Sequence, residues 1–90
     1  MKAAIFSEVG NASDRLRLAD LPTPSPRAHE VLVRVEARPI QPADFMFIEG
    51  SYRIKPVLPQ TAGLEGSGIV AQSSSSRFQA GARVAFRCPG

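Results

Sequence analysis

The sequence predicts a mainly β domain of 90 residues, a small barrel or sandwich with one short helix. Short apolar stretches with the two-residue period of strands recur along the chain, and Gly, Pro, Asn and Asp turn residues separate them. Only the segment around residues 42–50 has the length and the end signals of a helix. A chain of this length fills one hydrophobic core, so we expect a single domain.

The first two predicted strands form an antiparallel pair at the start of the chain. Residues 1–6 are predicted to form the first strand, and a polar turn follows it. Leu16 and Leu18 then alternate with arginines, which is the period of a half-buried strand. Prolines at every second position end this strand, because proline has no N–H to donate to a β ladder; they are Pro22, Pro24 and Pro26.

The clearest strand pattern runs from Val31 to Arg38. Val31, Val33 and Val35 alternate with longer or charged side chains, so these valines should lie on one face of a sheet. We expect them to form the spine of the hydrophobic core.

The predicted helix follows, from about Pro42 to Gly50. Proline suits the first helical turn, Asp44 places negative charge near the positive helix end, and glycine suits a C-terminal cap. The residues between are strongly apolar, so the helix should be buried on most sides. Core packing is the expected role of its apolar side chains, with the lining of a ligand pocket as the alternative: Phe45, Met46 and Ile48.

A glycine cluster leads into the next predicted strand, at residues 69–71. Gly63, Gly66 and Gly68 have the spacing G-x-x-G-x-G, whereas a dinucleotide-binding loop has G-x-G-x-x-G and opens a helix. We therefore expect close backbone packing or a bulge here and no phosphate-binding loop. The last predicted strand spans residues 83–87.

Charge and composition exclude several classes of function. The net charge is +3, but the basic residues are spread along the chain and do not alternate with aromatic residues, so we expect no nucleic-acid partner. No apolar run approaches the roughly 20 residues that cross a bilayer, and the apolar N-terminal stretch is too short for a signal peptide. We therefore expect a cytoplasmic protein, with the matrix of an organelle as the alternative. The single cysteine, Cys88, excludes an internal disulfide and a cysteine-rich zinc cluster.

Five short motifs follow one another along the chain, PIQPAD, IEGSY, LP, GLEGSG and GARV, at residues 39–44, 48–52, 58–59, 63–68 and 81–84. In this order they resemble the medium-chain dehydrogenase/reductases, and the resemblance covers nearly the whole chain. It implies a GroES-like domain, a partly open β-barrel that covers the nicotinamide end of a cofactor held by a separate Rossmann domain. Such a domain continues with further strands, so residues 1–90 are expected to be an incomplete substrate-side domain that cannot transfer hydride alone.

Two positions in these motifs distinguish the zinc enzymes of the superfamily from its zinc-independent branch. Zinc alcohol dehydrogenases have a cysteine where this chain has Gln41, and a histidine where it has Leu64. A catalytic zinc needs ligands such as thiolate and imidazole, and the neighbouring Glu65 could not hold the metal alone. The resemblance therefore implies a zinc-independent protein with no metal site.

Within that branch, residues 49–52 most resemble the 2-enoyl thioester reductases. The tyrosine that matches Tyr52 in those enzymes lies at the active site, near the thioester carbonyl. A phenol suits this place, because it can donate a hydrogen bond or a proton where enolate charge develops after hydride addition. The alternative is that the Tyr52 ring packs beside Pro56 or Pro59.

Gln41 is the candidate cofactor-binding residue. It matches an asparagine of the thioester reductases, and its amide could bond the nicotinamide carboxamide or the substrate carbonyl. A role in capping the following helix is an equal alternative. The resemblance implies NADPH as the cofactor and leaves an enoyl thioester and a quinone both open as the substrate.

A function without catalysis also remains open, that of a stand-alone GroES-like interaction or assembly module. A co-chaperonin needs a mobile glycine-rich loop early in the chain, whereas this early segment is short and stiffened by proline. Missing C-terminal strands would leave a sheet edge open, and an open edge pairs readily with another chain. We therefore expect that the chain can form a homo-oligomer through this edge.

Overall fold

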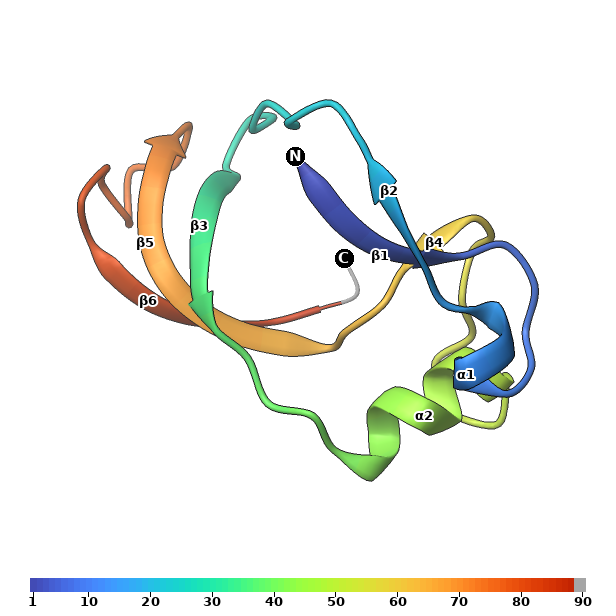
Figure 1. Ribbon diagram of the computed structural model, residues 1–90. Coiled ribbons are helices and arrows are strands. Elements are labelled where there is room, and N and C mark those ends of the chain that lie inside the picture. The colour runs from blue at the N-terminus through green and yellow to red at the C-terminus, as the bar shows by residue number, and fades with distance from the viewer. Residues whose placement is uncertain (89–90) are drawn as a thin grey trace. The chain divides into compact units, whose positions relative to one another are not determined.

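The computed structural model describes residues 1–88, and its strands form two sheets with no closed barrel among these residues (Figure 1). Pro89 and Gly90, which the predicted domain includes, lie outside the described residues. The mainly β class is confirmed, and a one-turn helix accompanies the expected one. In chain order the elements are β1 (Lys2–Phe6), α1 (Ala12–Arg15), β2 (Arg17–Asp20), β3 (Val31–Ala37), α2 (Pro42–Glu49), β4 (Gln60–Thr61), β5 (Glu65–Ser73) and β6 (Arg83–Arg87).

The chain divides into two compact units, and the first comprises residues 1–22 and 40–64. Its sheet has the order β2-β1-β4, and both pairings of β1 are antiparallel. The expected turn after β1 contains α1 instead, because Asn11 caps the helix by accepting the Ser13 N–H through Oδ1 at 3.0 Å. The expected half-burial of β2 is wrong at Leu18, which is 79% exposed, because β2 is an edge strand that pairs only with β1.

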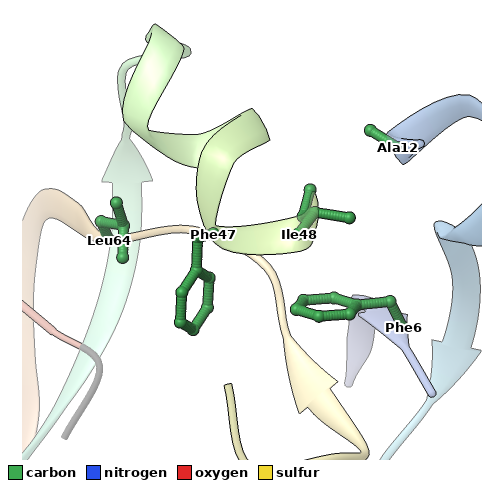
Figure 2. Packing of buried hydrophobic residues seen from close by; sticks show 5 residues of the cluster. All are labelled: Phe6, Ala12, Phe47, Ile48 and Leu64. Atoms are coloured by element: carbon green, nitrogen blue, oxygen red, sulfur yellow. The ribbon is translucent and has the colours of Figure 1, made fainter. Parts of the chain in front are cut away.

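An apolar cluster holds the first unit together. Phe6 of β1 and Phe47 of α2 are fully buried, and their rings meet edge to face with centroids 5.9 Å apart. Figure 2 shows these two rings between α2 and β1, with three further members of the cluster around them: Ala12, Ile48 and Leu64. Edge-to-face aromatic pairs are stabilising beyond the area that they bury, so this contact is central to the unit.

The helix α2 confirms the prediction for residues 42–50, but only one of its faces is buried. Asp44, Phe47 and Ile48 are buried and lie three and four residues apart, which places them on one face. The expected core packing is therefore confirmed for Ile48. It is wrong for Phe45 and Met46, which are 46% and 41% exposed because the helical period turns them away from the cluster.

The second unit comprises residues 23–39 and 65–90, and its described strands form an antiparallel sheet with the order β3-β5-β6. Gly68 in the middle strand lies opposite Val35, beside an irregularity in the β3–β5 register. A Cβ atom at Gly68 would lie only 2.0 Å from the Arg34 carbonyl oxygen. The close backbone packing expected at the glycine cluster is confirmed, because β3 approaches β5 where no side chain intervenes.

The expected spine of valines in β3 is wrong. Val31 and Val33 are only half-buried and Val35 is 49% exposed, whereas Val70 of β5 is 1% exposed. The described part of this unit contains one sheet and no helix, so it offers no second layer of its own to cover both faces of β3. The alternation identified the residues that share a face, but not how deeply that face is buried.

Candidate functional site

The two residues singled out in the sequence, Gln41 and Tyr52, lie in the first unit at opposite ends of α2. Gln41 is the N-cap residue, and Tyr52 follows the Gly50 C-cap by two positions. An eight-residue helix is about 12 Å long, so the two side chains start from points well separated along one rigid element. The structure therefore brings them to one helix without bringing them together.

Gln41 has the helix-capping position that the sequence left as an alternative. Asp44 Oδ2 accepts the backbone N–H of Gln41 at 2.9 Å, as the acidic residue of a capping box does. Asp44 is only 7% exposed, and its charge lies at the positive end of the helix. Local hydrogen bonding therefore fixes the backbone of Gln41 at this helix end.

Tyr52 is held against the C-terminal end of α2. Its backbone N–H donates to the Met46 carbonyl oxygen at 3.2 Å, and that of Ser51 donates to the same oxygen at 2.9 Å. Lys55 Nζ donates to the Gly50 carbonyl oxygen at 2.8 Å, which ties the following loop to the same helix end. These hydrogen bonds therefore fix the backbone of Tyr52 against the end of α2.

The Tyr52 ring is half-buried and packs against the apolar cluster of Phe6 and Phe47. The guanidinium carbon of Arg53 lies 5.8 Å from the centre of the ring. Among residues 1–88, no group forms a hydrogen bond with the Tyr52 hydroxyl, so its donor and its lone pairs are available to a ligand. Arg53 was given no role from the sequence, because its place next to Tyr52 does not by itself specify a contact between the two side chains.

The second position compared with zinc enzymes, Leu64, is part of the apolar cluster. Its side chain is 7% exposed and packs with Phe47 and its neighbours. The described residues include no group of three or more His, Cys, Asp or Glu side chains placed to hold a metal ion. Over the same residues, none of the helices has the length and apolar character needed to span a membrane.

The glycine cluster does not fit the phosphates of a dinucleotide. Gly66 and Gly68 belong to β5, where both are paired with β6. A phosphate-binding loop instead aims successive backbone N–H groups at the ligand from the start of a helix. The residues that this chain provides here therefore do not form the phosphate site of NADPH.

The second unit has a hollow of about 690 Å³ that is lined in part by Arg38, Ser67 and Phe86. Cys88, which directly follows β6, is half-buried. Burial raises the pKa of the Cys88 thiol, and the positive charge of Arg38 opposes part of that increase. A thiol with a raised pKa has less of the reactive thiolate at neutral pH, so Cys88 is a poor candidate for a nucleophile.

Comparisons with known proteins agree with the resemblance in the motifs. The family model "Alcohol dehydrogenase GroES-like domain" matches residues 27–90. The chain is 38% identical over 69 residues to the mitochondrial enoyl-[acyl-carrier-protein] reductase of Arabidopsis thaliana, covering 77% of this chain and 18% of that protein. It is 35% identical over 86 residues to the quinone oxidoreductase of Lama guanicoe, covering 93% of this chain and 26% of that protein.

A solved structure extends the similarity to three dimensions. The quinone oxidoreductase of Thermus thermophilus, which was also solved in complex with NADPH, superposes with a TM-score of 0.79 at 32% identity. The match covers 99% of this chain and 26% of that one. The chain thus spans about a quarter or less of the length of these relatives.

Proposed function

The chain belongs to the alcohol dehydrogenase GroES-like domain family, and from this premise we propose that it forms the substrate side of a zinc-independent, NADPH-dependent reductase of enoyl thioesters or quinones. The resemblance to the medium-chain dehydrogenase/reductases is confirmed by the same family match and by relatives that are enoyl and quinone reductases. In our proposal the protein acts in the cytoplasm, and the domain of residues 1–90 is not catalytically competent alone.

The observation that carries this proposal is the Tyr52 side chain, whose hydroxyl is open to a ligand. Its ring packs against the apolar cluster, while no described residue hydrogen-bonds the hydroxyl. A phenol in this state can donate a hydrogen bond to a carbonyl oxygen as that oxygen becomes negative, and can then protonate it. We assign Tyr52 this role on an enoyl thioester or a quinone.

The remaining residues of α2 complete the proposed site. Phe45 and Met46 are large apolar side chains that the helix leaves about half exposed, and they would contact the apolar part of the substrate. We assign Gln41 the orientation of the nicotinamide amide, by a hydrogen bond from its own amide, because Tyr52 at the other end of α2 is assigned the substrate carbonyl. NADPH supplies the hydride when bound, and its phosphates need a site other than the glycine cluster of this chain.

The open strands β3 and β6 are the edges of the second sheet. Within residues 1–88, each of them pairs with a strand on one side only, and an edge of this kind promotes pairing with another chain. We propose that the isolated chain can form a homo-oligomer by strand pairing at one of these edges.

The substitution Tyr52→Phe tests the proposed role, because it keeps the ring and removes only the hydroxyl. The assay uses a hybrid in which this chain replaces the matching quarter of the Thermus thermophilus quinone oxidoreductase. Turnover of a crotonyl thioester or of benzoquinone should fall about 10²-fold in the variant, since a positioned general acid contributes at least that much. The KM for NADPH should not change.

Two controls keep this result interpretable. NADPH binding by the hybrid, measured by fluorescence, shows that the assembled protein is folded before the variants are compared. The matched substitution Phe45→Leu, on the exposed face of α2, should change the KM for substrate more than the turnover. Equal turnover of the original hybrid and its Tyr52→Phe variant would reduce Tyr52 to a packing residue and remove the basis of the proposal.

A further inference from the structure

The loop after α2 places a cation over the one tyrosine of the chain. The guanidinium carbon of Arg53 is 5.8 Å from the centre of the Tyr52 ring, within the distance at which a cation is attracted to an aromatic face. Part of the same ring packs against the buried cluster that contains Phe6 and Phe47. The ring therefore contacts a buried apolar cluster on one part of its surface and an exposed cation on another.

These contacts restrict the ring without occupying its hydroxyl. A half-buried tyrosine at the start of a loop would otherwise rotate about its side-chain bonds, because only part of its surface meets the cluster. The backbone of Tyr52 is already tied to Met46, so the remaining freedom is that of the side chain. A contact of the Arg53 cation with the ring limits that freedom and leaves the phenol oxygen available.

We propose that Arg53 is a positioning residue that fixes the orientation of the Tyr52 phenol by a cation–π contact. The inference rests on the proposed role of Tyr52 for its functional meaning, but the positioning itself is a property of this chain. The positive charge of Arg53 also lies beside the phenol, where it favours negative charge on a substrate oxygen that the phenol contacts.

The aromatic composition of the chain allows this contact to be followed by near-ultraviolet circular dichroism. The chain contains one tyrosine and no tryptophan, so the near-ultraviolet circular dichroism band near 280 nm reports the asymmetry around Tyr52 alone. The five phenylalanines absorb at shorter wavelength and weakly. The measurement is made on the 90-residue chain itself and needs no catalytic activity.

Two substitutions at Arg53 distinguish the effect of its charge from the effect of the apolar part of its side chain. Arg53→Met keeps a long apolar stem and removes the charge, whereas Arg53→Lys keeps a cation that can also contact the ring. We expect the 280 nm band to fall by about half in Arg53→Met, because the cation–π contact is lost. It should stay close to its original intensity in Arg53→Lys.

The second unit contains a matched control. The guanidinium carbon of Arg77 lies 5.8 Å from the centre of the Phe78 ring, so Arg77→Met removes an equivalent contact that does not involve a tyrosine. This variant should leave the 280 nm band unchanged, and far-ultraviolet spectra should be the same for every variant.

Three results would overturn the inference. The first is a full 280 nm band in Arg53→Met, and the second is an equal loss in Arg53→Lys. The third is a comparable loss in Arg77→Met, because the band would then follow a general change in the protein. Failure of Tyr52→Phe to reduce turnover would instead contradict the proposed function and leave the positioning of the ring intact.

Discussion

Phe47→Ala is expected to lower the free energy of unfolding by about 3–5 kcal/mol, the range found when a buried phenylalanine is truncated. Phe47 is fully buried at the centre of the first unit, where its ring meets that of Phe6 at an interplanar angle of 87°. The substitution removes the ring and leaves a cavity between α2 and β1. A chain of this length typically has a stability of roughly 5–15 kcal/mol, so the loss would be a large part of the total.

Urea denaturation followed by far-ultraviolet circular dichroism measures this effect, and the same helix supplies the control. Phe45 lies two residues away and is 46% exposed, so Phe45→Ala should cost less than about 1 kcal/mol. Phe47→Leu keeps most of the apolar volume and should recover a large part of the loss. Similar losses for Phe45→Ala and Phe47→Ala would show that the cluster is not the centre of the unit.

Gly68→Ala is expected to have the second large effect, a loss of about 3 kcal/mol or more from overpacking between two strands. The added Cβ would lie 2.0 Å from the Arg34 carbonyl oxygen and 2.9 Å from the Arg34 carbonyl carbon. Both are backbone atoms, so β3 must move away from β5 and lose ladder hydrogen bonds. A flexible side chain could have yielded at little cost, but a paired strand cannot.

Gly81→Ala is the matched control for this steric effect. Nothing lies within 4 Å of a Cβ atom at Gly81, but its φ of 93° is unfavourable for alanine. The substitution should therefore cost about 1–2 kcal/mol from the backbone conformation alone. A Gly68→Ala protein as stable as the original in urea would show that the two strands are farther apart than described.

The elements that were predictable from the sequence are those fixed by residues close in the chain. The bounds of α2 follow from Pro42, Asp44 and Gly50, each of which acts within one helical turn. The strand β3 follows from its alternation of side chains. The two residues of β4 escaped prediction, because their pairing with β1 joins segments far apart in the chain and leaves no local pattern.

Burial was less predictable than secondary structure, for a physical reason. The valines of β3 and the apolar residues of α2 have the same composition as a buried core, but burial depends on which other elements cover them. Phe47 is covered by Phe6, whereas Phe45 and Val35 remain about half exposed. Periodicity defines a face, and only the tertiary structure decides how much of that face meets water.

Only those residues of the candidate site that lie in the family motifs could be predicted from the sequence. Gln41 and Tyr52 were identified by their places in family motifs, and the structure adds that they occupy the two ends of α2. The contact between Arg53 and the Tyr52 ring depends on the conformation of a loop, which no pattern of residue types specified. Their roles toward substrate and cofactor remain predictions.

We propose that this chain supplies the substrate side of a reductase site whose nucleotide is held by other polypeptide. Isothermal titration calorimetry of the 90-residue chain with NADPH tests this claim most directly, since a bound dinucleotide would need a phosphate site. We expect heats of dilution only, because the glycines at 66 and 68 lie within a paired strand. Binding of NADPH with micromolar affinity, abolished by a substitution in residues 63–68, would contradict the account.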